Sequence, residues 1–433
     1  MQIVAYGAQD IYLTGNPQIT FFKVVYRRHT NFSIECIDQI IKGNEPTLTA
    51  GSDVYATISR EGDLISNMHL EISFTGDDGP GTSGDYINWC HSTGHAYIKS
   101  CELEIGGHLI DKHYGQWLDI WNELTDHDTR EWPMLNKYPA RTDLVATGYG
   151  GDKSALNDLR CYVPLKFWFC RNYGLALPII ALQYHEVKVK FSFRSLNGLI
   201  NYNGASATSS LAAHSVSTKL WVDYIYLDTD ERRRFAQTSH EYLIEQVQYA
   251  EETLSTKVQL YFSHPVKELI WVGQDPTVAT ERTTQGTTQN ASGNDTSGGG
   301  AFTHGNDYFN YMSTGSSPSE YINGKQSHEH FTTAKLTFNG HDRFPARNAS
   351  YFSTIQPLQA GHRIPTKHVY MYSFALKPEE HQPSGTCNFS RIDNAYLEFG
   401  SVDTTGSKKI HIYATNYNVL RITSGMGGLA YTS

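Results

Sequence analysis

The stretch LWVDYIYLDTDERRRFAQTSHEYLIEQVQ, residues 220–248, lies near the middle of the chain and predicts where one structural unit ends and the next begins. Its first part alternates so that consecutive side chains point to opposite faces of a strand. Asp228 and Glu231 then have the spacing of a helix N-terminal cap, and the two-residue alternation returns in residues 243–248. We therefore expect a strand, a short basic linker helix over residues 228–238, and a second strand.

The composition favours β structure distributed over two domains. The chain has 433 residues, which is more than one hydrophobic core usually serves. It contains 28 Tyr, 19 Phe and 7 Trp, which are residues that favour strands, and no long stretch carries apolar residues at helical spacing. The net charge of −9 and the lack of a block of basic residues in the sequence disfavour direct binding to nucleic acid.

Two pairs of similar segments, with one member in each half of the chain, indicate a tandem duplication. LEIGGH at residues 103–108 resembles LTFNGH at residues 336–341, and both predict a strand, a tight turn and a strand. Arg27-Arg28 precedes the sequence SIE in the first half, much as Arg233-Arg234 precedes LIE in the second half. The matches occur in the same order within their halves, as expected of a repeated unit.

Further strand candidates recur at short intervals through both halves. They are residues 32–41, 54–60, 68–74, 162–169, 184–193, 258–263, 269–272, 368–376, 395–399, 410–414 and 419–422. One amphipathic helix places Trp117, Leu118, Trp121 and Leu124 on a common face. Residues 274–328 are dominated by Thr, Gly, Ser and Asn, so we expect a long surface excursion that contributes nothing to a core.

Many short strands joined by long loops, present twice, predict an all-β protein of two tandem eight-stranded jelly rolls with short linking helices. We expect an N-terminal arm at residues 1–25, a first jelly roll at 26–227, the linker helix at 228–238 and a second jelly roll at 239–433. The arm is unusually apolar around Phe21, so we expect it to pack against its own subunit or against a neighbour.

The sequence carries no sign of secretion or of a membrane span. The N-terminus lacks a positive patch followed by an apolar run, and no window approaches the roughly 20 apolar residues of a spanning helix. The six cysteines form no C-x-x-C pair. We interpret them as reduced thiols of a protein made in the cytoplasm, forming neither a zinc site nor a disulfide framework.

His328-Glu329-His330 is the best candidate for chemistry in the chain. Residues two apart on a strand share a face, so both imidazoles could hold one metal ion, as in cupins. The motif lies at the end of a long loop, and no carboxylate has a spacing from it that would indicate a further metal ligand. We therefore expect solvated loop histidines in preference to a metal site.

Two further motifs invite a functional interpretation. The glycine-rich segment at residues 425–428 superficially resembles a phosphate loop, but too few residues follow it for the required helix, so we expect a flexible or tightly packed tail. Arg232, Arg233 and Arg234, with Arg27-Arg28, could bind phosphate. We expect them to serve contacts between the rolls or between subunits.

Five Asn-x-Ser/Thr sequons have their asparagines at positions 31, 290, 294, 348 and 388. Such a motif signals glycosylation in a secreted protein, and it loses force in a chain without a signal peptide. Asn290 and Asn294 lie in the long loop and are the candidate sites.

Five segments resemble one known family. They are AYGAQDIYLTGNPQITFFKVVYRRHTNFSIE (residues 5–35), LALPIIALQYHEVKV (175–189), WVDYIYLDTDERRRFAQTSHEYLIEQ (221–246), YSFALKPEEHQPSGTCNFSRIDNA (372–395) and NYNVLRITSGMGGLAY (416–431). These segments are similar to the major capsid proteins of nucleocytoplasmic large DNA viruses, especially viruses of algae. The resemblance covers both halves and both termini.

The resemblance implies a structural protein of the virion, made in the host cytoplasm, with no catalytic activity and no cofactor apart from covalent glycans attached by virus-directed routes. It implies a double jelly roll that forms homotrimers, which are capsomers of pseudo-hexagonal outline. Many capsomers would tile an icosahedral shell around an inner membrane. The expected partners are neighbouring capsomers and minor capsid and penton proteins, with the loops outward and the arm at the base near the membrane.

Two alternatives from other classes remain open at this point. A two-domain carbohydrate-binding protein shares the sandwich architecture, and Tyr-rich loops suit sugars. An enzyme of cupin type rests on His328 and His330 alone.

Overall fold

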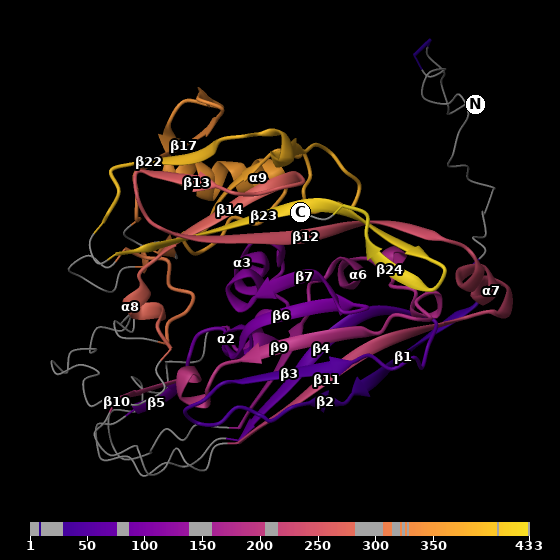
Figure 1. Cartoon of the computed structure of the whole chain (residues 1–433). Helices are drawn as coiled ribbons and strands as arrows, with labels where there is room; N and C mark the ends of the chain where they lie inside the picture. Colours follow the sequence, from indigo (N-terminus) through magenta and orange to yellow (C-terminus); the bar gives the residue numbers. More distant parts are fainter. Residues whose placement is uncertain are drawn as a thin grey trace, which may run out of the picture.

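The structure is a computed structural model in which two antiparallel β-sandwiches follow one another along the chain (Figure 1). It describes residues 8–9, 29–75, 86–137, 158–203, 215–281, 306–313, 321–322, 325–326, 329–404 and 407–431. The predicted arm at residues 1–25 lies outside the described residues, apart from 8–9.

The first roll is built from two sheets. Sheet A has the strand order β1-β11-β4-β8, formed by β1 (Phe32–Gln39), β11 (Ser215–Leu227), β4 (Leu64–Thr75) and β8 (Leu159–Pro164). Sheet B has the order β2-β3-β9-β6-β7, formed by β2 (Ile41–Lys42), β3 (Ser52–Thr57), β9 (Val187–Phe193), β6 (Ile98–Ile105) and β7 (His108–Tyr114). A separate ribbon pairs β5 (Tyr86–Trp89) with β10 (Ile200–Asn203).

The second roll repeats this plan. Sheet C has the order β12-β23-β14-β20, formed by β12 (His240–Thr253), β23 (Lys409–Thr423), β14 (Pro265–Gln274) and β20 (Tyr370–Ser373). Sheet D has the order β13-β22-β17-β18, formed by β13 (Lys257–Leu260), β22 (Ala395–Gly400), β17 (Thr333–Phe338) and β18 (His341–Asp342). Short strands add to these sheets or stand apart: β15 (Tyr321–Ile322), β16 (Lys325–Gln326), β19 (Arg347–Asn348), β21 (Cys387–Asn388) and β24 (Met426–Leu429).

The two rolls have the same connectivity. Counted from the start of each roll, β1, β4, β8 and β11 occupy the positions that β12, β14, β20 and β23 occupy in the second roll, and the strand orders of sheets B and D correspond in the same way. Each roll therefore has eight equivalent strands. The predicted fold class, two tandem jelly rolls, is confirmed.

Short helices lie between the strands. They are α2 (Thr93–Tyr97), α3 (Gly115–Thr125), α4 (Trp132–Leu135), α6 (Trp168–Arg171), η1 (Tyr173–Leu175), η2 (Ile179–Ala181), η3 (Leu196–Leu199), α7 (Thr229–Gln237), α8 (Pro276–Ala279), η5 (Tyr351–Ile355), α9 (Gln356–Ala360) and η6 (Phe389–Arg391). α7 connects the last strand of the first roll to the first strand of the second. It begins where the Oδ1 atom of Asp228 accepts a hydrogen bond from the backbone N–H of Thr229.

The matching hairpins have the same turn. Gly106 and Gly107 join β6 to β7 with φ of 60° and 81°, and Asn339 and Gly340 join β17 to β18 with φ of 49° and 81°. Positive φ at both central residues defines a type I′ turn, whose twist fits a two-residue hairpin. Glycine and asparagine tolerate this conformation, so the repeated sequence produces a repeated structure.

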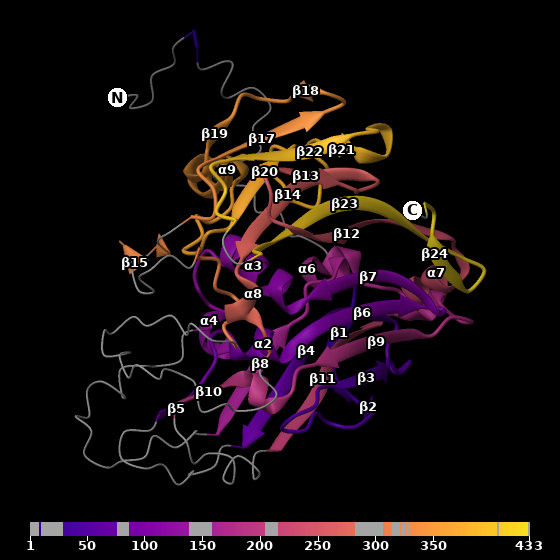
Figure 2. The ribbon, with the colours of Figure 1, turned by 60° about the vertical axis from the view of Figure 1, so that its left-hand side comes forward.

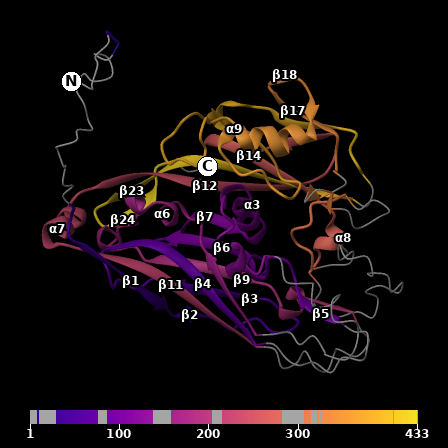
Figure 3. The ribbon, with the colours of Figure 1, turned by 180° about the vertical axis from the view of Figure 1, so that it is seen from behind.

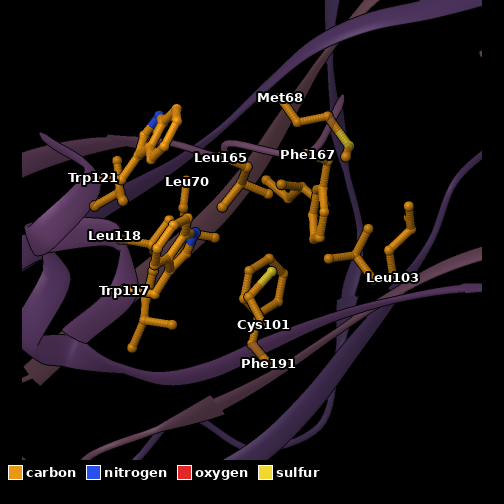
Figure 4. Packing of buried hydrophobic residues seen from close by; sticks show 14 of the residues in the cluster. Met68, Leu70, Cys101, Leu103, Trp117, Leu118, Trp121, Leu165, Phe167 and Phe191 are labelled. Atoms are coloured by element: carbon orange, nitrogen blue, oxygen red, sulfur yellow. The ribbon is translucent and has the colours of Figure 1, made fainter. Parts of the chain in front are cut away.

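The core of the first roll follows the two-residue period of its strands. Val187, Val189, Phe191 and Phe193 are buried in β9, while the lysines between them face outward. Figure 4 shows Phe191 with side chains from β4, β6 and α3 in the same interior. Full burial of one such aliphatic or aromatic side chain contributes about 1.5–3 kcal/mol to folding. The predicted face of α3 is confirmed, because Trp117, Leu118, Trp121 and Leu124 are all buried.

Several predicted strands differ in extent, since β9 begins at Val187 and β20 covers only Tyr370–Ser373, and two further differences change the path of the chain. The strand predicted at residues 162–169 ends at Pro164, which has no N–H to continue the ladder, and the chain then turns into α6. The strands predicted at 410–414 and 419–422 are one strand, β23, which pairs with β12 over its whole length. The polar residues between the two predicted ranges are accommodated in the strand, since Asn418 donates a hydrogen bond to Gln246 across the pair at 2.9 Å.

The rolls lie side by side, and sheet C is the layer of the second roll next to the first. Figures 1 and 3 show α3 and β7 directly beneath β12 and β23, with sheet D on the far side of sheet C. The view in Figure 2 shows the same order, with the first roll below and the second above. Among the described residues, none of the helices is long and apolar enough to cross a membrane.

Candidate assembly interfaces

An apolar interface among the described residues joins the two rolls of one chain. Ile270, Val272 and Tyr413, on the outer face of sheet C, belong to one buried apolar cluster with Trp117 of α3. The ring centroids of Trp117 and Tyr413 are 5.2 Å apart. Because the same cluster continues into the core of the first roll, the rolls pack as one body.

Polar contacts fix the orientation of this interface. Tyr413 donates a hydrogen bond from its hydroxyl to Oε1 of Gln116 at 2.6 Å, and Gln116 donates from Nε2 to Oε1 of Gln274 at 3.3 Å. The backbone N–H of Val247 donates to Oδ1 of Asp111 at 3.1 Å. Such bonds are directional, so they select one register of the two rolls where apolar contact alone would allow several.

A buried ionic cluster lies between α3 and the second roll. Nζ of Lys367 is 2.7 Å from Oδ2 of Asp119, and Nζ of Lys137 is 2.8 Å from Oε1 of Glu123 and 3.7 Å from Oδ1 of Asp119. All four side chains are buried. Burial raises the pKa of Asp119, but the positive charges of Lys367 and Lys137 outweigh it and hold that pKa well below its usual value. The cluster therefore stays charged and links the rolls electrostatically.

A second charge cluster surrounds the buried side chain of His362, which follows α9. Its Nε2 atom is 3.0 Å from Oε2 of Glu268, and its Nδ1 atom is 2.6 Å from Oε1 of Glu379. Burial lowers the pKa of His362, but hydrogen bonds to the two carboxylates outweigh this effect and raise the pKa from 6.5 to about 9. The imidazole is therefore charged at neutral pH. It packs edge-on against Trp121 of the first roll.

The raised pKa of His362 predicts a loss of stability at high pH. The contribution of His362 to the free energy of unfolding is fully present below the unfolded pKa of 6.5, and it is lost as the pH rises through about 9. At about 1.4 kcal/mol per unit, the contribution is about 3 kcal/mol. Urea denaturation of wild type and His362→Gln across this range should give curves that converge at high pH. Parallel curves would contradict the assignment.

The segment at residues 306–313 corrects the prediction that the long loop contributes nothing to a core. Tyr308, Phe309 and Tyr311 are buried in the cluster shared by the two rolls. The hydroxyl of Tyr308 donates to the backbone oxygen of Gly198 at 2.8 Å, and the guanidinium of Arg194 lies 4.0 Å from its ring centroid. The polar composition of the loop as a whole concealed one short aromatic segment that returns to the first roll.

The predicted arginines of α7 are exposed. Nε of Arg232 is 2.9 Å from Oδ1 of the buried Asp63, so this residue ties the linker helix to the first roll. Arg233 and Arg234 project from the same helix. Their role in contacts between subunits stays a prediction, and Arg27 and Arg28 lie outside the described residues.

The expectation of solvated loop histidines was wrong for His330. Its side chain is fully buried against β14, and burial, reinforced by Lys408 and His368, lowers its pKa to about 3. His330 is therefore a neutral core residue. His328 lies outside the described residues, and within the described part of the chain no group of three His, Cys, Asp or Glu side chains is arranged to hold a metal ion.

The packing of His330 predicts the effect of one added methyl group. A Cβ atom at Gly273 would lie 2.6 Å from Cδ2 of the His330 ring, which is closer than real contacts allow. Gly273→Ala should lower the free energy of unfolding by about 1–3 kcal/mol. Gly428→Ala is the matched control, because nothing lies within 4 Å of its added atom. Equal denaturation midpoints for both variants would show that the ring moves aside freely.

The glycine-rich C-terminal segment is a packed strand. β24 pairs with β23, and the backbone N–H of Gly427 donates to Nδ1 of His185 in the first roll at 3.1 Å. A Cβ atom at Gly427 would lie 2.7 Å from a methyl group of Leu182. The glycine thus permits close approach of the two rolls, which agrees with the tightly packed alternative.

The candidate glycosylation sites Asn290 and Asn294 lie outside the described residues. The other three sequon asparagines, Asn31, Asn348 and Asn388, are described and exposed. The Oδ1 atoms of Asn348 and Asn388 each accept a hydrogen bond, at 3.0 Å, from the backbone N–H two residues further on. These are local turn contacts of asparagine.

Comparison with protein families accounts for both rolls. Residues 20–228 match the family model described as major capsid protein N-terminus, and residues 231–428 match the model described as large eukaryotic DNA virus major capsid protein. The chain belongs to this family of viral major capsid proteins. The two matches divide the capsid protein at α7, where the first roll ends and the second begins.

Individual relatives agree along the whole capsid protein. It is 46% identical to the major capsid protein of Pyramimonas orientalis virus and 42% identical to that of Paramecium bursaria Chlorella virus 1, with 100% of this chain and 99% of each relative covered. A quasi-atomic model of the PBCV-1 virus capsid superposes with a TM-score of 0.73 at 37% identity, covering 96% of this chain and 100% of that chain. The predicted family and its structural role in the virion capsid are confirmed, in preference to the lectin and cupin alternatives.

Proposed function

We propose that three copies of this capsid protein form one capsomer with six similar lobes, and that such capsomers tile an icosahedral shell. The observation that carries the proposal is the identical strand order of the two rolls. A subunit with one roll would need six copies to produce a six-lobed unit. A duplicated subunit needs three, because a closed three-fold ring then presents six equivalent lobes.

The work of such a protein is assembly, without bond-making or bond-breaking chemistry. Burial of apolar surface at about 25 cal/mol per Å² drives association. A permanent trimer needs a larger interface than the contact between neighbouring trimers. The further expected partners are minor capsid and penton proteins. An inner membrane would lie near the base of the capsomer. The chain would be synthesised in the host cytoplasm. Covalent glycans on the outer loops belong to the same proposal.

Light scattering coupled to size-exclusion chromatography tests the oligomeric state directly. The purified full chain should elute as a species of three times the chain mass of 48.7 kDa. The trimer should persist on dilution, as expected of a permanent interface. A monomer, or an assembly that is not a multiple of three, would overturn the proposal.

A further inference from the structure

The contact between the two rolls of one chain is of the head-to-tail kind. The first roll contributes a flank made of β7 and α3, and the second roll contributes the outer face of sheet C. Because the rolls have the same connectivity, each roll has both kinds of surface, a flank and an outer sheet face. One flank and one sheet face are therefore left over. They are the flank of the second roll around η5 and α9, and the outer face of sheet A in the first roll.

The outer face of sheet A has the character of an interface. Phe32 and Ile34 of β1 are 54% and 48% exposed, although they stand directly beside the apolar residues of β11. Further along the same face, Trp221, which pairs with Asp38 of β1, stacks on His69, with ring centroids 6.4 Å apart. Half-exposed aromatic and aliphatic side chains on an otherwise regular sheet face are typical of protein contact surfaces. Figure 3 shows β1 and β11 on the side of the molecule away from sheet C.

The flank of the second roll is its counterpart. The helix in this position of the first roll, α3, is buried against sheet C, whereas η5 and α9 leave Ile355 and Leu358 exposed by 42% and 62%. Arg343 and Arg347, in the segment that leads to this helix, are also exposed. The outer face of sheet A carries the carboxylates Asp38 and Asp223. These carboxylates can pair with the two arginines, on a face that also carries Lys219 and Arg160 beyond the end of β1.

We propose that the outer face of sheet A binds the η5–α9 flank of a second copy of this chain, so that the contact between subunits repeats the contact between rolls. This inference rests on the proposed trimer and names the surfaces that close it. Each contact is heterologous, so one copy uses its sheet face and the next copy uses its flank. When every roll-to-roll step turns by one sixth of a revolution, three chains close a ring with no surface of either kind left over.

Two double variants with opposite defects test the pairing. Phe32→Asp with Ile34→Asp places charge on the sheet face and leaves the flank intact. Ile355→Asp with Leu358→Asp does the reverse. Each variant alone should be a monomer by light scattering, and an equimolar mixture should form a dimer, because one intact flank meets one intact sheet face and the ring cannot close.

Tyr261→Asp with Tyr431→Asp is the matched control, because it adds the same charge at exposed aromatic residues outside both surfaces and should remain a trimer. Circular dichroism melting curves report whether each variant is folded. Persistence of the trimer in either double variant, or a mixture that stays monomeric, would overturn the pairing while leaving the trimer itself intact. A wild-type chain that is not a trimer would overturn the proposed function instead.

A second measurement leaves sheet A unmutated, so a folding defect in that sheet cannot explain its result. Hydroxyl-radical footprinting should label Trp221 and His69 weakly in the wild-type trimer. Labelling of both should rise severalfold in the monomeric Ile355→Asp/Leu358→Asp variant, whose substitutions lie in the other roll. Equal labelling of Trp221 in the two proteins would contradict the inference.

Discussion

Asp119→Ala should lower the free energy of unfolding by about 3–5 kcal/mol, because it leaves Lys367 and Lys137 buried with too little negative charge. The carboxylate accepts contacts from both lysines inside the interface between the rolls, where water cannot replace it. Urea denaturation at a fixed protein concentration measures the loss, since the stability of an oligomer depends on concentration.

The control for Asp119 is an exposed carboxylate. Glu252→Ala, at the end of β12, should change the stability by less than about 0.5 kcal/mol. Combining Asp119→Ala with Lys367→Met should recover part of the loss, because the second change removes one uncompensated charge. A double variant that is no more stable than Asp119→Ala alone would contradict the electrostatic explanation.

Trp117→Ala should also lower the free energy of unfolding by about 3–5 kcal/mol, because it removes packing contacts. This side chain is fully buried, and its ring lies 5.3 Å from that of Trp121 and 5.2 Å from that of Tyr413. The substitution opens a cavity where both rolls meet, so the two rolls should also unfold less cooperatively. Denaturation followed by tryptophan fluorescence and by far-ultraviolet circular dichroism should give separate midpoints.

Tyr261→Ala provides the comparison for that variant, since it truncates an aromatic ring that is largely exposed. Its stability should stay within about 0.5 kcal/mol of the wild type. If Trp117→Ala were no more damaging than Tyr261→Ala, the interface between the rolls would not depend on α3.

Local sequence signals predicted most of the fold. The alternation in β9 and β11, the cap at Asp228 and the hairpin turn at Gly106-Gly107 each depend on residues close together in the chain. The repeated LEIGGH and LTFNGH segments extended that local information to the whole chain, because equal turns at equal positions indicate equal rolls. The family resemblance then identified the role in the capsid.

The interface between the rolls could not be predicted in the same way. Asp119 and Lys367 come from different rolls, and nothing in the neighbourhood of either residue identifies its partner. In α3, Asp119 and Glu123 lie one turn apart on the side of the helix opposite Trp117 and Trp121, as expected of an amphipathic helix with a polar face. Two acids on the polar side of an amphipathic helix predict a solvated surface, so nothing in the sequence indicated the buried lysines that pair with them.

The buried segment at residues 306–313 was missed for a related reason. Composition averaged over the long loop is polar, while the burial of Tyr308 and Tyr311 depends on Arg194 and Lys367, which lie far away in the sequence. His330 was likewise assigned to solvent because of its place beside a polar loop. Its burial follows from the absence of a side chain at Gly273, which makes room for the ring.

Electron microscopy of the purified capsid protein tests the central claim most directly. If two rolls of equal connectivity supply six lobes from three chains, class averages viewed along the symmetry axis should show one ring of six similar lobes with three-fold symmetry. A ring of three lobes, a ring of six whole chains, or isolated two-lobed particles would contradict it.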